Sequence, residues 1–256
     1  MTTKKLIIAA KASLAVLTFS SIFSIPQSYA DVSVGDPHEG GTVFCVSQTP
    51  DITTCVPQGS GKYGLIMANE DQVNFDSNAK HGVTWATEYK KTGASSDDDG
   101  AANTAAIIAT HPKDNLSNNA AWLCHNYRDP EGRTGWYLPS KNELNKMYQF
   151  AKANNLIGRN CAGSKPGGIQ CLIGGHENDG KYMVYWSSTE SSHFTNLAWY
   201  QYFNDGGQLD GYKSYVQFGA RAVRVFINST IRPLDALPMP KSPLAIGLTT
   251  VEFSSI

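Results

Sequence analysis

Short apolar runs alternate with polar and Gly-rich stretches along the middle of the chain, and several of these runs have the composition of β-strands. "GGTVFCV" (Gly40–Val46) and "YGLIMA" (Tyr63–Ala68) are rich in β-branched and aromatic residues, and they predict the two strands of one hairpin. Three later strands are predicted from "YMVYWSS", "LAWYQYF" and "YVQFGARAVRVF". In the second of these, side chains alternate between two faces, and we expect one face to be buried in a core.

A helical spacing of hydrophobic positions appears in "PSKNELNKMYQFA". Ser140 and Glu143 have the spacing of a capping box, which predicts that an amphipathic helix begins at Ser140. A second helix is predicted to begin near Asn103, with the acids of "SSDDDG" at its N-terminus, and "AAWLCHNY" has the composition of a third. The core-facing positions of the Ser140 helix are Leu144, Met147, Tyr148 and Ala151.

The acidic run before the second helix has some features of a calcium-binding loop. Asp97, Asp99 and Gly100 match the third, fifth and sixth positions of an EF-hand loop. Ser95 and Ala106 would then occupy the first and twelfth positions, where carboxylate ligands are required. "GSGKYG" likewise lacks the spacing of a phosphate-binding loop. We therefore expect no metal ion and no cofactor.

The N-terminal segment has the pattern of a cleaved export signal. Lys4 and Lys5 precede an apolar run from Leu6 to Ile25, and "SYA" ends at a small residue before Asp31. A retained membrane anchor is the alternative, although one lysine and several Ser and Thr interrupt the run. We expect a protein of the periplasm, the cell surface or the medium, with no membrane span after cleavage. The predicted division is a signal peptide at 1–30, one domain at 31–227 and a proline-rich tail at 228–256.

The charge balance argues against a uniformly basic surface. The chain has 21 basic and 22 acidic residues, and loss of the three lysines of the leader leaves a net charge of −4. Nucleic acid is therefore not an expected partner, and a sulfated sugar would need a local basic cluster. Arg221 and Arg224 lie in a predicted central strand, where a buried acid such as Glu143 is the expected partner. The candidates for a basic cluster are Arg128, Arg133, Lys141 and Lys213.

All five cysteines lie in the part of the chain predicted to be exported, where disulfides form. Cys45 and Cys55 flank a turn-like segment, and Cys161 and Cys171 flank a Gly- and Pro-rich one. These spacings predict two short disulfide loops, Cys45–Cys55 and Cys161–Cys171. Cys124 is left over in a predicted helix, where we expect a buried thiol.

Two sets of residues invite a catalytic interpretation. Cys124 and His125 are neighbours on a predicted helix, where adjacent side chains do not face each other. Ser187, Ser188 and His193 are close in sequence, but "YWSSTE" lacks the strained turn that presents a nucleophilic serine. We therefore predict that these serines satisfy backbone groups at a strand end and that the protein is not an enzyme.

Seven motifs in order resemble the Lcl C-terminal domain family, which takes its name from a Legionella collagen-like surface adhesin: "GGTVFCV", "YGLIMA", "DGAANTAAI", "GWYLPSKNEL", "YWSSTE", "AWYQYFNDGGQ" and "RAVRVF". The resemblance extends from about Val34 to Ile227. It implies an α+β, C-type-lectin-like domain in which two helices flank a small antiparallel sheet with long loops. It also implies that the first strand, "GTVFCV", pairs with the last, "RAVRVF".

The same resemblance implies surface adhesion and binding of sulfated glycans. The chain has no Gly-x-y stalk, and it lacks the Glu-Pro-Asn and Trp-Asn-Asp motifs with which C-type lectins coordinate calcium and sugar. A calcium-dependent mechanism is therefore not expected. Formylglycine-generating enzymes, which have a related fold and two active-site cysteines, are a less favoured alternative, since no motif of theirs is matched.

The predicted ligand surface consists of two loops, around Ser191–Asn196 and Asn204–Lys213. Aromatic, amide and acidic groups gather there beside predicted strands. Tyr200 and Tyr202 share one face of the strand between these loops, and either could stack on a sugar ring. The candidate ligand-binding residues are His193, Tyr200, Tyr202, Asn204, Asp205, Asp210, Lys213 and Arg133.

The sequence thus predicts an exported, non-enzymatic binding protein, a surface adhesin or lectin-like module for glycans or other host-surface ligands. The alternative is an accessory or structural subunit of a surface or secretion assembly, with the tail at 228–256 as its docking segment. A homo-oligomer is compatible with either function.

Overall fold

A computed structural model describes residues 32–47, 55, 64–72, 82–112, 119–158, 161, 168–177, 182–215 and 218–227. The predicted signal peptide and the proline-rich tail lie outside these ranges and stay predictions. None of the described helices has the length and apolar character needed to cross a membrane.

The first sheet is antiparallel and has the strand order β1-β2-β3-β8. It consists of β1 (Pro37–His38), β2 (Gly41–Val46), β3 (Gly64–Ala68) and β8 (Val223–Phe226). The predicted pairing of the first two long strands is confirmed, because β2 and β3 are antiparallel neighbours. The predicted pairing of the first and last strands is wrong, because β8 pairs with β3 and not with β2. Every residue of β3 is buried, so this apolar strand takes the interior position between two neighbours.

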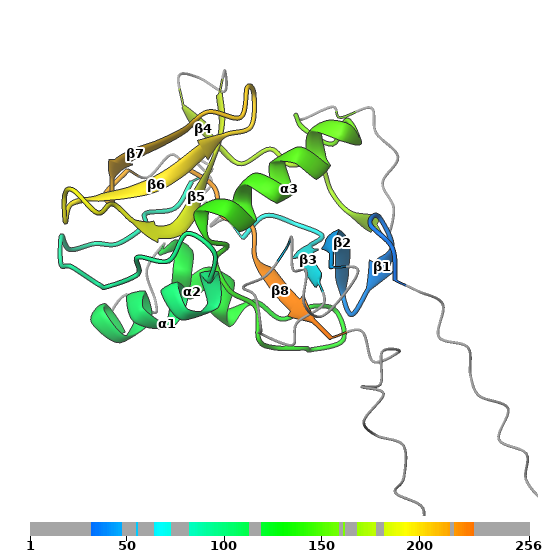
Figure 1. Cartoon of the computed structure of the whole chain (residues 1–256), viewed down its shortest axis with the longest axis horizontal. Helices are drawn as coiled ribbons and strands as arrows, with labels where there is room; N and C mark the ends of the chain where they lie inside the picture. Colours follow the sequence, from blue (N-terminus) through cyan, green and yellow to red (C-terminus); the bar gives the residue numbers. More distant parts are fainter. Residues whose placement is uncertain are drawn as a thin grey trace, which may run out of the picture. The chain divides into compact units, whose positions relative to one another are not determined.

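The second sheet is also antiparallel and has the order β4-β5-β6-β7. Its strands are β4 (Gly175–Glu177), β5 (Tyr182–Glu190), β6 (Leu197–Tyr202) and β7 (Gln208–Tyr212). Figure 1 shows it as the yellow sheet on the left, with β1, β2, β3 and β8 on the right. The segment predicted to be a loop at Asn204–Lys213 contains the edge strand β7, which the sequence pattern did not predict.

Three helices are described where the family resemblance implied two: α1 (Gly100–Thr110), α2 (Ala120–Asn126) and α3 (Lys141–Ala153). Helix α3 contacts β2 of the first sheet and β5 and β6 of the second. Its predicted capping box is present, and all four predicted core positions are buried. Asp99 caps α1 by accepting a hydrogen bond from the backbone N–H of Ala102, as expected for the acidic run.

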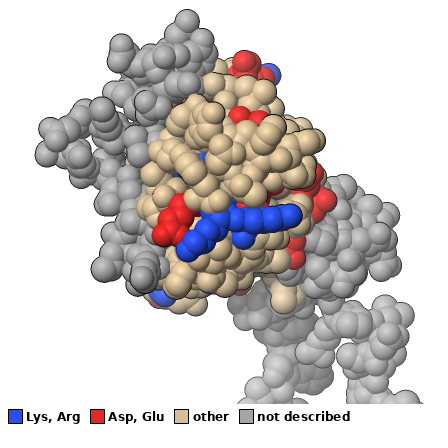
Figure 2. Space-filling view, turned by 90° about the vertical axis from the view of Figure 1, so that its left-hand side faces the viewer, with Lys and Arg blue, Asp and Glu red and all other residues tan. Residues whose placement is uncertain are grey.

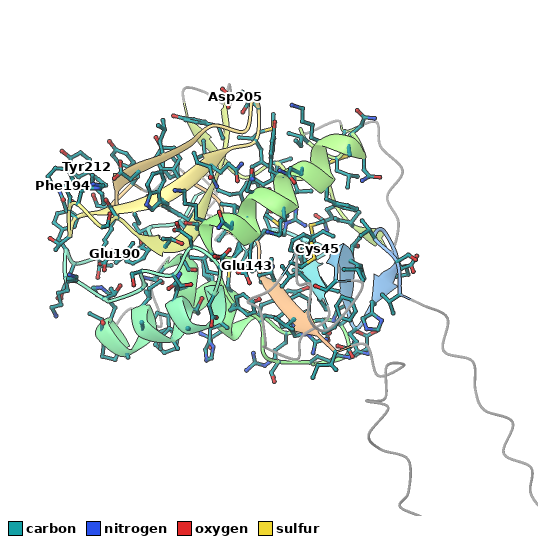
Figure 3. All side chains as sticks on the ribbon, in the orientation of Figure 1. Cys45, Glu143, Glu190, Phe194, Asp205 and Tyr212 are labelled. Carbon is teal, nitrogen blue, oxygen red and sulfur yellow. A yellow bond between two sulfur atoms is a disulfide. The ribbon has the colours of Figure 1, made fainter. Side chains whose placement is uncertain are left out.

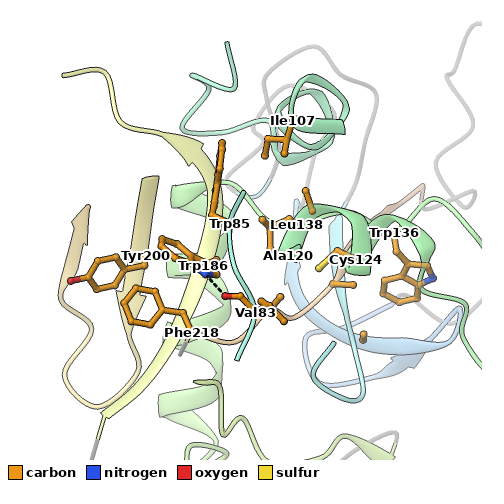
Figure 4. Packing of buried hydrophobic residues seen from close by; sticks show 14 of the residues in the cluster. Val83, Trp85, Ile107, Ala120, Cys124, Trp136, Leu138, Trp186, Tyr200 and Phe218 are labelled. Atoms are coloured by element: carbon orange, nitrogen blue, oxygen red, sulfur yellow. Dashed lines mark hydrogen bonds between the residues drawn. The ribbon is translucent and has the colours of Figure 1, made fainter. Parts of the chain in front are cut away.

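A cluster of large aromatic side chains joins the second sheet to α1 and α2. Trp85, Trp186 and Phe218 are buried there, and the Trp186 indole donates a 2.9 Å hydrogen bond to the carbonyl of Val83 (Figure 4). Each buried ring removes a large apolar area from water, so the cluster fixes the position of the strands around it.

The predicted covalent structure is confirmed. Cys45 is bonded to Cys55, and Cys161 is bonded to Cys171. Among the described cysteines Cys124 alone is free, and its buried position raises the pKa of the thiol, with a smaller contribution from the negative charge of Asp71. The mixed α+β class is likewise confirmed, and the likeness to C-type lectins stays a prediction.

Candidate ligand-binding surface

One end of the second sheet brings together parts of the two predicted ligand loops. The backbone N–H of Lys213 donates a 3.0 Å hydrogen bond to the carbonyl of Asn196, and Leu197 pairs with Tyr212. Figure 3 shows Phe194 and Tyr212 close to each other at this end, whereas Asp205 lies at another corner of the molecule. The turn that contains Asn204 and Asp205 is at the opposite end of the β6–β7 hairpin, so these two predicted residues do not join the other loop.

A buried ion pair supports this end of the sheet. Nζ of Lys213 lies 2.5 Å from Oε1 of Glu190 and donates a second hydrogen bond, of 3.0 Å, to the carbonyl of Lys90. The Glu190 carboxylate also accepts hydrogen bonds from the backbone N–H groups of Thr92 and Gly93. The pair therefore ties three segments of the chain together.

Lys213 is consequently not a ligand contact, and the prediction that placed it in an exposed loop is wrong. Its side chain is fully buried, and Nζ also lies 4.5 Å from the centroid of the Trp85 ring. Burial lowers the pKa of Lys213, while the hydrogen bond and the charge of Glu190 act in the opposite direction. Glu190 and the Trp85 ring thus replace the water that an exposed ammonium would have.

Four exposed rings gather around the end of β7, and we call this set the aromatic surface. The exposed fractions are 51% for Tyr89, 61% for Phe194, 47% for Tyr212 and 38% for Tyr215. Tyr212 and Tyr215 are in edge-to-face contact at 5.6 Å, and the Tyr89 hydroxyl lies 2.8 Å from the hydroxyl of Ser214. Phe194 and Tyr212 lie within the two predicted ligand loops, but the rings predicted to stack on a sugar were Tyr200 and Tyr202 on the strand between them, and Tyr89 and Tyr215 were not predicted. The sequence signal that could have identified the aromatic surface is the presence of four aromatic residues in or next to turn-rich segments.

The predicted stacking tyrosines are placed differently. Tyr200 is only 8% exposed and packs on Phe218, with ring centroids 4.5 Å apart, so it is a core residue and cannot stack on a sugar ring. Tyr202 is partly buried and contacts Tyr200 edge to face. The opposite face of β6 is covered as well, because Gln201 is buried and donates to Asn145 of α3. The expected core face of this strand is therefore confirmed as the one that carries Ala198 and Tyr200, and the opposite face is covered in addition.

Polar groups lie next to the aromatic surface. Asp210 on β7 accepts a 2.8 Å hydrogen bond from the hydroxyl of Ser191, which joins β7 to the Ser191–Asn196 loop. His193 is exposed, and its Nδ1 lies 3.2 Å from the hydroxyl of Ser192. Two of the predicted ligand residues, Asp210 and His193, are thus placed beside the exposed rings.

The strand-end serines are part of the framework. Ser187 is buried, and its hydroxyl donates to the carbonyl of Trp199 and accepts from the backbone N–H of Thr189. Ser188 is buried beside Asn103, whose amide donates to its hydroxyl at 3.4 Å. The Ser187 hydroxyl therefore satisfies backbone groups, as predicted, whereas the Ser188 hydroxyl accepts from a side chain.

The cations that were candidates for a basic cluster each have local partners. Arg128 donates to backbone carbonyls, Lys141 lies over the Trp199 ring at 3.5 Å, and Arg133 is paired with Asp129 and Glu131. On the face seen in Figure 2, Lys and Arg form one narrow band with acidic side chains on both sides, and most of the face is uncharged. Because Lys213 is buried, it cannot belong to an exposed basic cluster, and a cluster of Arg128, Arg133 and Lys141 stays a prediction.

Arg221 pairs with a buried acid, as predicted, but that acid is Asp71 and not Glu143, whereas Arg224 pairs with the more exposed Glu39. The strand predicted to be central is β8, which lies at the edge of the first sheet. Arg221 lies 2.6 Å from Asp71, and Arg224 lies 2.7 Å from Glu39. The Glu143 carboxylate instead accepts hydrogen bonds from the Tyr137 hydroxyl and from the Ser140 backbone. Within the described ranges, no group of three or more His, Cys, Asp or Glu side chains is placed to hold a metal ion.

Comparison with known proteins identifies one family. The model of the Lcl C-terminal domain matches residues 76–224, a narrower range than the motifs indicated. No curated protein matches the chain.

Proposed function

Because the chain belongs to the Lcl C-terminal domain family, we propose that it is a non-enzymatic adhesion domain that holds a glycan against its aromatic surface. The observation that carries this proposal is the exposure of Tyr89, Phe194, Tyr212 and Tyr215 at one end of a rigid sheet. Monomeric proteins rarely expose grouped rings without a partner for them.

The chemistry of these rings suits a sugar. One face of a pyranose ring carries mainly C–H groups, and an exposed aromatic ring can cover that face and exclude water from both. Tyrosine also offers a hydroxyl that hydrogen-bonds the edge of the same sugar. Tyr212 and Tyr215 meet at an angle of 77°, so they present two walls to one ligand.

Polar groups beside the rings can orient a bound sugar through hydrogen bonds. Asp210, Ser191 and His193 lie around the β5–β6 loop and offer acceptors and donors for sugar hydroxyls. The Asp210 carboxylate disfavours a sulfate group beside it, and Lys213, the basic residue expected in this loop, is buried. The favoured ligand is therefore a glycan that carries few sulfates, bound without calcium.

We also propose that the domain is exported and acts at the cell surface with a C-type-lectin-like fold. Two disulfides support folding in an oxidising compartment.

A glycan array probed with the purified protein tests this function. We expect retention on at least one glycan, no loss when a chelator is added, and little loss when salt is raised to the physiological range. Retention on no glycan, together with capture of a protein partner that requires residues 228–256, would replace this proposal by the accessory-subunit function.

A further inference from the structure

A polar hollow of about 340 Å³ lies between the β1–β2 turn and the segment 130–133. In Figure 1, β1 is on the right of the molecule and the β6–β7 hairpin is on the left, so the hollow is remote from the aromatic surface. Its walls include Arg133, which the sequence singled out as a ligand residue, together with Glu131, Glu39 and His38.

Arg133 is held in one orientation by a buried acid. The Asp129 carboxylate accepts hydrogen bonds from the Arg133 backbone N–H at 2.8 Å and from its Nη1 at 3.1 Å. Burial disfavours the charged form of Asp129, but these hydrogen bonds outweigh burial and keep its pKa below the ordinary value. Nε and Nη2 of Arg133 have no hydrogen-bond partner among the described residues, so they remain available to a ligand. Two N–H groups on a planar guanidinium match the two oxygens of a carboxylate.

The opposite wall of the polar hollow is the β1–β2 turn, which packs against Asp129. A Cβ atom on Gly40 would lie 1.8 Å from Oδ2 of Asp129, so only glycine allows this close approach. The preceding residue, Glu39, has a φ of +42°, a conformation in which a non-glycine residue is strained by on the order of 1 kcal/mol. Glycine or asparagine would adopt this conformation with less strain, but the residue at this position is a glutamate.

The Glu39 side chain is itself fixed. Its Oε2 accepts a 2.7 Å hydrogen bond from Arg224, and its Oε1 lies 3.8 Å from Nε2 of His38. That nitrogen is buried and has no hydrogen-bond partner among the described residues. The hollow therefore has pre-set groups on both walls, and one of them lacks a partner.

Opposite charges adjoin within this hollow. Oε2 of Glu131 lies 2.7 Å from Nη1 of Arg133, so the exposed edges of a carboxylate and a guanidinium lie side by side. A simple anion would be repelled by Glu131 and Glu39, and a simple cation by Arg133. A ligand that satisfies both must carry a positive and a negative group only a few bonds apart.

We propose that the polar hollow binds a free α-amino acid, with its carboxylate on Arg133 and its ammonium on Glu131 and Glu39. The α-carbon carries both charges, which suits the adjacent carboxylate and guanidinium of Glu131 and Arg133, and the volume accommodates a side chain of moderate size. This site is independent of the glycan function proposed above.

Calorimetric titration of the purified protein with each proteinogenic L-amino acid tests the proposal. At least one should bind, and its N-acetyl and methyl ester derivatives should each bind about tenfold more weakly or worse, because each has lost one charge. Arg133→Gln and Glu131→Gln should weaken binding by a similar factor. Arg128→Gln is the matched control, because Arg128 donates only to backbone carbonyls and does not line the hollow.

Glu131 is exposed, so Glu131→Gln keeps the test valid even if Arg133→Gln loosens the turn around Asp129. The proposal is overturned if no amino acid binds, if the acetylated and esterified derivatives bind as tightly as the parent, or if Glu131→Gln leaves the affinity unchanged.

Discussion

The ammonium group of Lys213 lies 2.5 Å from a carboxylate oxygen of Glu190, and both side chains are buried at the end of the sheet that carries the aromatic surface. Figure 3 places Glu190 close to Phe194 and Tyr212. The pair links β5, the segment 90–93 and the residues after β7, so the aromatic surface depends on it.

Removal of one partner of this pair should destabilise the protein strongly. Lys213→Ala leaves the Glu190 charge buried without its cation, and we expect the free energy of unfolding to fall by about 3–5 kcal/mol in urea denaturation. Lys91→Ala, at an exposed lysine, should cost under about 0.5 kcal/mol. A Lys213→Met/Glu190→Gln double variant should lose less than Lys213→Ala. Equal stability of the two single variants would show that the pair does not hold this end together.

The stability of the protein should fall as pH rises from about 4.5 to about 7. Burial of Glu143 outweighs its hydrogen bonds and raises the pKa of this carboxyl from 4.5 to about 7. Between these values the folded protein holds a proton that the unfolded chain has released, so folding is favoured at the acidic end. The loss amounts to at most about 3 kcal/mol by the usual linkage.

Glu143→Gln should flatten this pH dependence, because glutamine does not titrate and still offers an acceptor to the Ser140 backbone N–H. Urea unfolding across the same pH range measures both proteins. A wild-type protein whose free energy of unfolding rises from pH 4.5 to 7, with no change on substitution, contradicts the assignment to Glu143.

Two substitutions in helix α3 compare its buried face with its more exposed face. Leu144 is fully buried, and Leu144→Ala should lower the free energy of unfolding by about 2–5 kcal/mol. Lys146 is on the more exposed side of the same helix, and Lys146→Ala should cost under about 0.5 kcal/mol. Thermal melts compare the two, and similar losses would mean that a different face of α3 is buried.

Cys124 should resist thiol reagents in the folded protein. Its side chain is inaccessible, and burial raises the pKa of the thiol and so reduces the thiolate that reacts. Iodoacetamide should label Cys124 only after denaturant is added, and non-reducing peptide mapping should recover Cys45–Cys55 and Cys161–Cys171. Rapid labelling of the native protein, or a peptide that links Cys124 to another cysteine, is the contrary result.

Local features were predictable from the sequence, and long-range ones were not. The start of α3 and its buried face were correct because a capping box and a helical period are local signals. The partner of β8 was wrong because strand order is decided by contacts between distant segments. Strand β7 was missed because "QLDGY" has little strand propensity of its own and is held by its pairing with β6.

In the candidate site, too, local features were predictable from the sequence and long-range contacts were not. The Ser191–Asn196 loop and Asp210, which the sequence marked as ligand-binding, do lie together in the structure, and their binding of a ligand stays a prediction. It could not show that Lys213 is buried, because its partner Glu190 is 23 residues away. Tyr200 was chosen over Tyr212 because residue type and spacing do not reveal which ring the neighbouring Phe218 covers.

The affinity of a Phe194→Ser/Tyr212→Ser variant for the glycan retained on the array tests the central claim most directly. Both rings are exposed, so the variant should melt at the wild-type temperature. Val34→Ser, which removes an exposed apolar side chain outside the aromatic surface, is the matched control. We predict that calorimetry will show at least a tenfold loss of affinity for the double variant and no loss for the control. Wild-type affinity in the folded double variant would contradict the assignment of the aromatic surface as the glycan site.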